Sequence, residues 1–287
     1  MDELPFTGER FIPGTRGEIW VEHWHRYHFA RPWVAGKRVL DIACGEGYGS
    51  ALLARDAQHV TGVDVSEAAV AHARAAYAAV GNAAFLQGSC EAIPLADASV
   101  DVVVSFETLE HIAAQEAFVD EIARVLAPSG VVLLSCPNKA EYSDRRGYAN
   151  EFHVKELYRD ELAALLARRF PATAWFDQKP DFFSVIAPQG QAVAGAVAEV
   201  EESAPADASP RFANPMYFIV AAGRDAQALA AVPAPLHVFA DRGEWVRRDY
   251  EKVMGWMQQA VADRERLQRE VEERDRTIAG LRRELGK

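Results

Sequence analysis

A glycine-rich segment near residue 40 is flanked by two aspartates whose spacing suits nucleotide binding. Apolar residues from Val39 to Ile42 predict a buried strand, and the loop that follows carries three glycines, which let backbone N–H groups approach a ligand because glycine has no Cβ. A second strand-like run ends in an acid, whose carboxylate could accept hydrogen bonds from two ribose hydroxyls. The acids and glycines are Asp41, Gly45, Gly47, Gly49 and Asp64. This pattern predicts a site for an adenosine-containing cofactor at the carboxyl edge of a parallel sheet.

A second group of reactive side chains comes directly after a predicted strand over residues 100–106. Glu107, Glu110 and His111 are spaced so that a helix would place all three on one face. Two carboxylates and an imidazole on one face of a cleft are costly unless a cation lies between them. We therefore expect a cationic group between these side chains.

The spacing of the glycines distinguishes between two kinds of cofactor. A dinucleotide fingerprint has the form G-x-G-x-x-G, whereas this chain has G-x-G-x-G with Ser50 where the third glycine would fall. With Asp41 and Asp64, the loop resembles the first two motifs of class I S-adenosylmethionine-dependent methyltransferases. The resemblance implies S-adenosylmethionine as the cofactor, with Phe106 at the end of the fourth strand among its contacts. An NAD-dependent oxidoreductase or sugar epimerase is the alternative from another enzyme class.

The segment QGSCEAIPL, over residues 87–95, is similar to the one that frames adenine in these methyltransferases. That family often has G-D-A-E-x-L-P, so Ser89 stands where an aspartate would accept a hydrogen bond from the adenine amino group. A serine hydroxyl accepts such a bond more weakly, and the Cys90 N–H could reach a ring nitrogen. We expect Glu91 to contact the cofactor as well. The Cys90 side chain could instead be a small buried apolar group.

The E-x-x-E-H arrangement looks like that of metal-dependent O-methyltransferases that act on vicinal diols, such as those that modify the terminal ribose of small RNAs. Ubiquinone-pathway enzymes that act on catechols share a related segment. In the small-RNA group a further histidine completes the site, and the matching position here is His153. The resemblance implies Mg²⁺ or Mn²⁺ held by Glu107, Glu110, His111 and His153.

Two mechanisms stay open for these residues. If a metal occupies one nitrogen of His111, that ring cannot act as a free base, and His25, His23 or bulk water would take the proton. If no metal binds, His111 could be the general base of a metal-independent O- or N-methyltransferase that acts on a small metabolite. In both cases the N-terminal segment 1–35, with a helix expected over about 18–30, would form a lid over the pocket.

A wider resemblance covers about the first 225 residues. Bacterial class I methyltransferases found with surface-polysaccharide (O-antigen type) glycosyltransferases have segments similar to GERFIPG, EHWHRYHFA, VLDIACGEGYGS, VSFETLEHI and SCPNKAEYSDRRGYANEFHVKELYRDEL. The resemblance implies methyl transfer to a sugar hydroxyl of a saccharide or glycan acceptor. A glycosyltransferase or the polysaccharide-export machinery would then be a partner.

The elements that must position these residues alternate along the chain. Strands are predicted over 38–43, 59–64, 83–87, 100–106, 130–136, 172–187 and 215–222, and helices over 47–56, 66–80, 115–126 and 155–168. Such alternation favours a parallel sheet with helices on both faces. The expected fold class is therefore α/β, with a doubly wound, mostly parallel, seven-stranded Rossmann-like methyltransferase sheet over residues 36–224.

The rest of the chain differs from this domain in composition. Residues 190–210 are rich in Ala, Glu and Pro, which predicts a flexible insertion, and 225–242 are expected to be a linker. Over 243–287, apolar residues recur at spacings of three and four between charged ones, which predicts a coiled-coil helix about 60 Å long. We expect a homodimer through this helix. A helix packed along its own domain, and a non-catalytic assembly module, are the alternatives.

Composition excludes several classes of partner. A net charge of −11 argues against broad attraction to nucleic acid or an anionic membrane. The three cysteines are far apart in the 287-residue sequence, which predicts no disulfide framework and suits a reducing cytoplasm. The N-terminus MDELPFTGER predicts no signal peptide, and no apolar run approaches the roughly 20 residues of a membrane helix.

Overall fold

The computed structural model describes residues 17–180, 199–201, 204–209, 214–230, 236–239, 243–284 and 286. The chain divides into two compact units, one built around a β-sheet and one that contains the C-terminal helix. The beginning of the expected lid (1–16), most of the expected insertion and parts of the expected linker lie outside the described residues.

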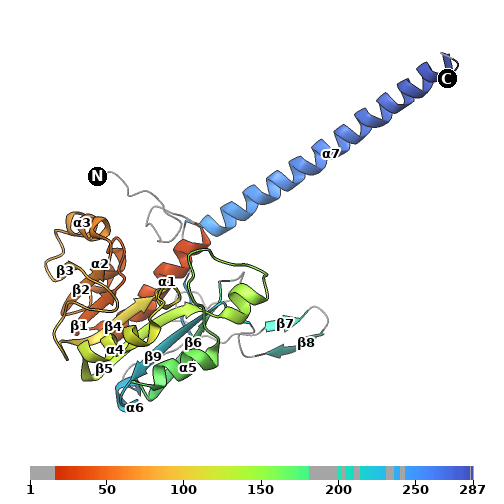
Figure 1. Cartoon of the computed structure of the whole chain (residues 1–287). Coiled ribbons are helices and arrows are strands. Elements are labelled where there is room, and N and C mark those ends of the chain that lie inside the picture. Colours follow the sequence, from red (N-terminus) through yellow and green to blue (C-terminus); the bar gives the residue numbers. More distant parts are fainter. Residues whose placement is uncertain are drawn as a thin grey trace, which may run out of the picture. The chain divides into compact units, whose positions relative to one another are not determined.

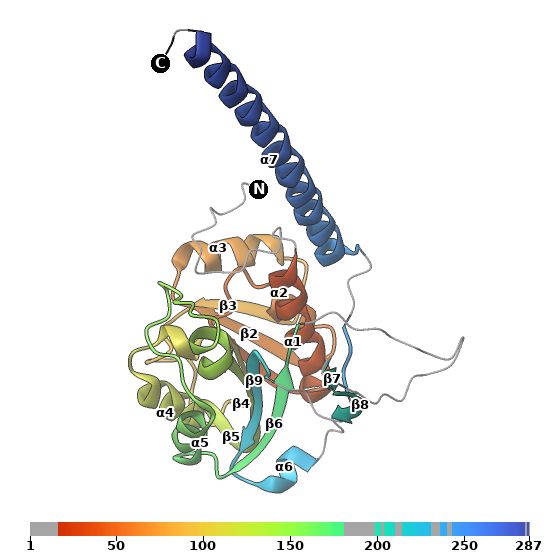
Figure 2. The same ribbon diagram turned by 90° about the vertical axis from the view of Figure 1, so that its right-hand side faces the viewer.

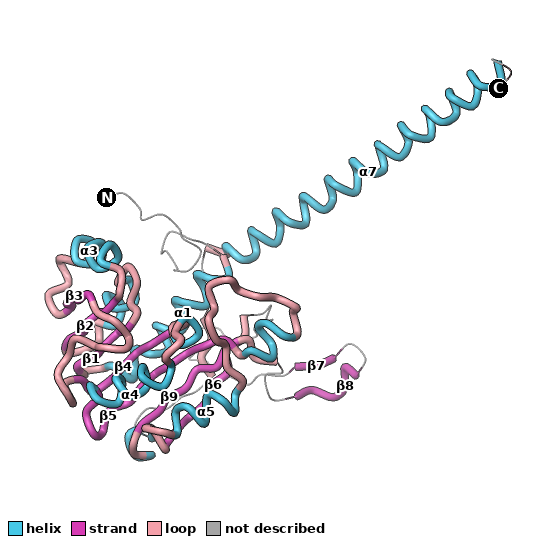
Figure 3. Tube along the Cα trace, viewed as in Figure 1, coloured by secondary structure: helices cyan, strands magenta, loops and turns pink. Residues whose placement is uncertain are grey.

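Seven strands form the main sheet (Figures 1 and 3). They are β1 (Arg38–Ile42), β2 (His59–Asp64), β3 (Ala83–Gln87), β4 (Val100–Phe106), β5 (Leu126–Pro137), β6 (Ala172–Gln178) and β9 (Tyr217–Gly223). Their order is β3-β2-β1-β4-β5-β9-β6. Neighbours from β3 to β5 pair in parallel, whereas β9 is antiparallel to both β5 and β6. The predicted mostly parallel, seven-stranded sheet is confirmed.

Helices cover both faces of this sheet (Figure 2). They are α1 (Glu18–Val34), α2 (Tyr48–Leu53), α3 (Glu67–Ala76), α4 (Gln115–Val125), α5 (Arg159–Ala167) and α6 (Ala226–Ala230). Trp33 of α1 and Leu53 of α2 are buried on one face, and Phe118 of α4 and Leu162 of α5 are buried on the other. Because both faces are covered, central strands such as β4 are apolar runs rather than alternating ones.

Two boundaries near the site differ from the sequence prediction. β5 begins at Leu126, four residues before the predicted start, because Leu126 already pairs with Val100 ahead of a register shift. The helix predicted over 155–168 begins only at Arg159, because the preceding residues form a bridge in which Leu157 pairs with Asn138. The segment between Pro137 and Arg159 lies beside the predicted catalytic residues, where the Phe152 carbonyl bonds to His111.

Part of the expected insertion carries regular structure. β7 (Glu199–Glu201) and β8 (Ala204–Ser209) pair as antiparallel strands in a sheet of their own. The expectation that residues 190–210 are a flexible insertion stays a prediction.

The C-terminal unit contains one long helix, α7 (Trp245–Glu284). None of its side chains is buried, and its apolar residues, including Val253, Met257, Leu267 and Val271, are exposed. The predicted helix is present, and its pairing with a second copy stays a prediction. Neither α7 nor any other described helix is both long and apolar enough to span a bilayer.

The strand order reverses between β1 and β4, since the chain continues from β1 toward β3 and later from β4 toward the opposite edge. In open α/β sheets, ligands bind outside the carboxyl ends of the strands at such a reversal. The glycine loop follows β1, Asp64 ends β2 and the E-x-x-E-H motif follows β4. The fold therefore brings the three predicted motifs to one edge of the sheet.

Candidate active site

The loop after β1 contains three residues with left-handed backbone conformations. They are Ala43 (φ 59°), Gly45 (φ 55°) and Gly47 (φ 80°). Gly49 lies inside α2 instead, and an added Cβ there would stand 2.0 Å from the Tyr27 ring. Gly49 thus belongs to the helix and not to the predicted loop, and it allows α1 to pack closely on α2; its contact with a cofactor stays a prediction.

Asp64 supports this loop from the end of β2. Its carboxylate accepts hydrogen bonds from the Gly45 N–H at 2.8 Å and from the Ser66 N–H at 2.9 Å. Each oxygen keeps a second lone pair, and the residue is partly exposed. Asp64 thus fixes the loop and could still accept a bond from a ribose hydroxyl, which stays a prediction.

Asp41 is buried beneath the loop. It accepts hydrogen bonds from the Tyr27 hydroxyl of α1 at 3.1 Å and from Ser50 Oγ of α2 at 2.6 Å. Burial raises the pKa of Asp41 to about 7, against the effect of these two donors. Since protein groups occupy its oxygens, Asp41 joins α1, β1 and α2, and a direct bond to the cofactor stays a prediction.

The segment predicted to frame adenine forms a tight turn in which Ser89 bridges to Ala92. Ser89 Oγ accepts a hydrogen bond from the Glu91 N–H at 3.1 Å, and the Glu91 side chain is exposed. Burial raises the pKa of Cys90 to about 12, so its thiol stays protonated at neutral pH. Phe106 packs edge-on against Tyr27 in the core. Contact of these four residues with a cofactor stays a prediction.

The residues after β4 do not form the single helical face that the sequence predicted. Only Leu109–His111 form a short 3-10 helix, and Glu107 has a left-handed backbone (φ 50°). The Glu107 side chain accepts a 2.7 Å hydrogen bond from Ser135 Oγ and lies 3.6 Å from Arg26 Nη2. The expectation that Glu107 shares one helix face with Glu110 and His111 is wrong.

Glu110 is the most unusual acid of the site. Its side chain is buried, and neither carboxylate oxygen accepts a hydrogen bond from another described residue. Burial and the neighbouring charge of Glu107 raise its pKa well above the usual range. A buried carboxylate without such a donor is costly, so this position suits a proton or a bound cation.

His111 lies beside Glu110 with its ring orientation fixed. Its Nδ1 bonds to the Phe152 carbonyl at 2.9 Å, which makes Nδ1 the protonated nitrogen of the neutral ring. Nε2 then carries the lone pair and lies 3.9 Å from Glu110 Oε1. Ligand atoms of Glu110, His111 and His153 all lie within 4.8 Å of one another. Three of the four predicted metal ligands therefore come together, without Glu107.

His153 is held by residues that the sequence analysis did not single out. Its Nδ1 bonds to Glu156 Oε1 at 2.6 Å, and its Nε2 lies 3.0 Å from the Asn150 amide nitrogen. Asn150 Oδ1 accepts the Phe152 N–H, which sets the orientation of that amide. A carboxylate behind a histidine is a typical support for a metal ligand. The i, i+3 spacing of Glu156 from His153 was the available signal.

Arg26 of α1 is fully buried near the carboxylates of Glu107 and Glu110. Its Nε donates to Gln178 Oε1 at 2.7 Å, and its guanidinium lies 4.4 Å from the centre of the Tyr217 ring. The Tyr217 hydroxyl in turn donates to Glu22 Oε2 at 3.1 Å. The four-residue spacing of Glu22 and Arg26 placed both on one helix face, but their partners on β6 and β9 are more than 150 positions away. Such pairings have no local sequence signal.

His25 does not reach this cluster. Its Nε2 lies 2.9 Å from Nδ1 of His237, and its ring stacks on those of His237 and Phe239. Burial lowers the pKa of His25 to about 4. The role of His25 as the acceptor of the reaction's proton stays a prediction. His23 Nδ1 bonds to the Tyr48 hydroxyl at 3.1 Å.

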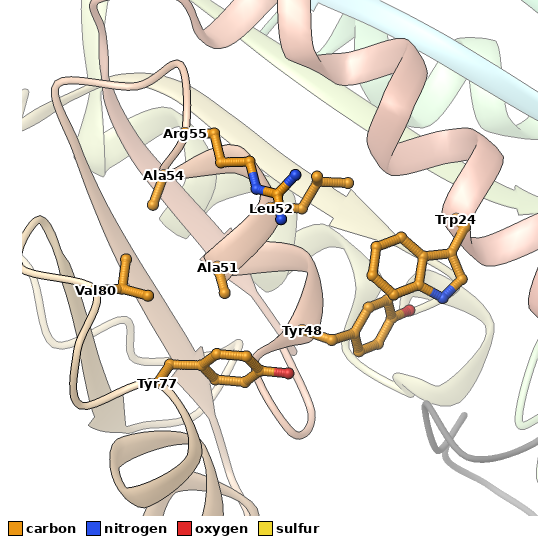
Figure 4. A pocket seen from close by; sticks show the side chains of 8 residues that line it. All are labelled: Trp24, Tyr48, Ala51, Leu52, Ala54, Arg55, Tyr77 and Val80. Carbon is orange, nitrogen blue, oxygen red and sulfur yellow. The ribbon is translucent and has the colours of Figure 1, made fainter.

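A pocket of about 320 Å³ adjoins the helix that follows the glycine loop (Figure 4). Its walls are the aromatic rings of Trp24, Tyr48 and Tyr77, and Arg55 is the one charged residue among its lining. None of the predicted site residues lines it. This pocket is therefore separate from the polar group formed by Glu110, His111 and His153.

Comparisons with known proteins agree with this geometry. Residues 40–134 match the family described as a methyltransferase domain. A Mycolicibacterium smegmatis protein described as a "probable S-adenosylmethionine-dependent methyltransferase" is 46% identical over 57% of this chain and 63% of its own length. A ubiquinone biosynthesis O-methyltransferase of Neisseria meningitidis is 37% identical over 37% of this chain and 46% of its own. The chain thus spans less than two thirds of either relative.

The fold has a counterpart among solved structures. The YcgJ protein of Bacillus subtilis, 20% identical, superposes with a TM-score of 0.50 over 71% of this chain and 100% of its own. Residues 40–134, which carry the glycine loop, Asp64 and Glu110, are therefore similar in sequence to a methyltransferase domain, and the sheet around them has the Rossmann-like fold of a methyltransferase.

Proposed function

We propose that the protein is an S-adenosylmethionine-dependent O-methyltransferase that methylates a sugar hydroxyl, with a divalent cation held by Glu110, His111 and His153. The observation that carries the proposal is the buried Glu110 carboxylate, which accepts no hydrogen bond from another described residue. The oriented imidazoles of His111 and His153 lie beside it. The name of the Neisseria relative supports an oxygen acceptor. The sugar itself rests on the resemblance to polysaccharide-associated methyltransferases.

The donor set fits a divalent cation that binds oxygen and imidazole. The carboxylate suits Mg²⁺ or Mn²⁺, and the two imidazoles would complete a donor set that leaves coordination positions open. A bound cation would lower the pKa of an acceptor hydroxyl and so increase its nucleophilicity. A vicinal diol would present two oxygens to such a site.

The residues around the cluster have supporting roles in this proposal. The Phe152 carbonyl holds the Nδ1 proton of His111, and Glu156 holds that of His153, so both rings present Nε2. Asn150 donates to His153 Nε2 and would have to rotate away before His153 could act as a ligand. Glu107 stays with Ser135 and Arg26, where it balances the arginine charge.

Titration of the full chain with Mn²⁺ tests the metal directly. We expect one Mn²⁺ site, and we expect Glu110→Gln and His111→Ala each to weaken it by more than about tenfold, because each removes a ligand. S-adenosylmethionine should bind all variants alike. His59→Ala is the matched control, because His59 is an exposed histidine at the start of β2.

The same variants separate the proposal from its main alternative. If His111 is instead the general base of a metal-independent enzyme, EDTA will leave methyl transfer to a saccharide panel unchanged. His111→Ala will then abolish transfer while Glu110→Gln is tolerated. The orientation of His111 by Phe152 suits that role as well. Equal turnover with and without EDTA would decide against the metal.

We also propose that α7 pairs with α7 of a second copy. Its apolar seam is exposed along its length, and an exposed apolar stripe on a helix is costly in water. Sedimentation of the full chain should show a dimer that Leu267→Glu dissociates, because Leu267 lies in the seam. Gln268→Glu adds the same charge beside it and should leave the dimer intact. A monomer at micromolar concentration would contradict the proposal.

Two further proposals rest on the resemblance and on composition. A glycosyltransferase or the export machinery of a polysaccharide would be the partner of such an enzyme. The three cysteines are free thiols, which suits a reducing cytoplasm.

A further inference from the structure

A short π-helical segment, Ala140–Asp144, lies beside the group formed by Glu110, His111 and His153. Its Tyr142 ring stacks on His153, with ring centres 5.4 Å apart and planes at 27°. Tyr142 also contacts Tyr217, and the Arg26 guanidinium packs over the Tyr217 ring. Tyr142 is thus part of the wall of the candidate site, and π-helical turns often occur at functional sites.

Arg146 packs against the Tyr142 ring and against the neighbouring Tyr148 ring. Its guanidinium carbon is 5.7 Å from the centre of the Tyr142 ring and 5.5 Å from that of Tyr148. Among the described residues, its one hydrogen bond is a weak one, from Nη1 to Met216 Sδ at 3.7 Å. The two rings therefore hold the cation in place without neutralising it.

The acids near Arg146 are engaged by other groups. Glu141 pairs with Arg145 at 2.9 Å, and Asp144 accepts the Tyr158 hydroxyl at 2.7 Å. Glu156 is taken by His153 and Ser143. Within the described part of the chain, no carboxylate lies at ion-pair distance from Arg146. Arg146 is therefore an exposed cation without a carboxylate partner among the described residues. It packs on the Tyr142 ring, which in turn stacks on His153.

We infer that Arg146 binds an anionic group of the acceptor, a sugar carboxylate or phosphate, while the acceptor hydroxyl lies at Glu110, His111 and His153. A guanidinium presents a planar pair of donors that matches both oxyanions. Tyr142 and Tyr148 would flank the sugar that joins the two ends. This inference rests on the proposed function, since it names the acceptor class of the same site.

Binding of matched sugars tests it without turnover. The full chain, saturated with S-adenosylmethionine, would be titrated with methyl β-D-glucuronide, glucose 6-phosphate and neutral methyl β-D-glucoside. We expect at least one anionic sugar to bind about ten- to hundredfold more tightly than the neutral one, the range of a charge-assisted hydrogen bond. Which anion binds distinguishes a uronic acid from a sugar phosphate.

Arg146→Met should abolish that preference and leave binding of the neutral glucoside unchanged. Arg145→Met is the control, because Arg145 is exposed, adjacent and already paired with Glu141. Both arginines are on the surface, so neither change should impair folding. Added salt should reduce the preference of the wild-type protein.

Several outcomes would overturn the inference. These are equal binding of neutral and anionic sugars, absence of binding by both anions, or equal effects of Arg145→Met and Arg146→Met. Transfer of a labelled methyl group to any of the sugars is a separate readout. Its absence together with an Arg146-dependent anion preference would contradict the proposed function and leave the anion subsite standing.

Discussion

Replacing Gly49 with alanine should destabilise the sheet unit and weaken S-adenosylmethionine binding. An added Cβ would lie 2.0 Å from Cζ of Tyr27, well inside contact distance, and Tyr27 is buried against Tyr48 and Phe106. Because the ring cannot move without breaking its bond to Asp41, α1 must shift away from α2. We expect a loss of at least about 1–3 kcal/mol in the free energy of unfolding.

Urea unfolding followed by tryptophan fluorescence measures this loss. Gly81→Ala is the matched control, because nothing lies within 4 Å of a Cβ at Gly81. That change should be neutral or slightly stabilising, since it restricts the unfolded chain. Calorimetry of S-adenosylmethionine would show weaker binding for Gly49→Ala alone.

A double-mutant cycle distinguishes the steric cause from a general effect on the helix. Tyr27→Ala removes the ring that the new Cβ meets, so the cost of Gly49→Ala should fall sharply in that background. Additive losses in the double variant would show that Gly49 and Tyr27 do not oppose each other. The close approach of α1 and α2 would then have another origin.

The glycine loop illustrates what local sequence pattern can predict. The strand, the loop and the following helix are set by residues close together in the chain, so their types were predictable. The conformation of each position was less so: Ala43 adopts a left-handed backbone although it is not glycine, and Gly49 is helical. The backbone of a loop follows from its neighbours in space as well as from its own residues.

The E-x-x-E-H motif shows the opposite limit. Its spacing predicted a helix face, but a helix needs several turns to be stable, and here the chain forms a single 3-10 turn. Ser135 of β5 binds the backbone and side chain of Glu107 and turns it toward Arg26. Since Ser135 lies on a neighbouring strand, no pattern within residues 107–111 could have shown this.

The mostly parallel, seven-stranded sheet was predictable from the alternation of strands and helices along the sequence. The buried polar network of Arg26, Gln178 and Tyr217 was not. Arg26, Gln178 and Tyr217 come from three separate parts of the chain. Each is an ordinary residue in its own segment. Only the order of β9 and β6 at one edge brings them to α1.

Removing the Arg26 charge should be the most damaging single change in this network. The side chain is fully buried between acids, and Arg26→Met would leave the half-buried Glu107 and the buried Glu110 without this cation. Breaking a buried ion pair from one side typically costs about 3–5 kcal/mol. We expect a loss of that size in the free energy of unfolding from urea titrations at pH 8.

Arg31→Met is the matched control on the same helix. Arg31 bonds to Asp56 at 2.6 Å, but both side chains are about one-third exposed, and such surface pairs contribute about 0–1 kcal/mol. If Arg26→Met fails to fold, Arg26→Lys keeps the charge and should fold with a smaller loss. Equal losses for the Arg26 and Arg31 variants would contradict the buried-charge argument.

The pH dependence of Arg26→Met gives an independent test of the cause. Burial raises the pKa of Glu110 in the folded state, so its contribution to stability is full at low pH and is lost as pH rises. Without Arg26 beside it, that loss should become larger, because the ionised form has no compensating charge. The difference in unfolding free energy between wild type and Arg26→Met should therefore shrink from pH 8 to pH 5. A difference that stays constant over this range would show that Arg26 stabilises the protein through packing against Tyr217 and Gln178, and that its charge is not what the acids of the site require.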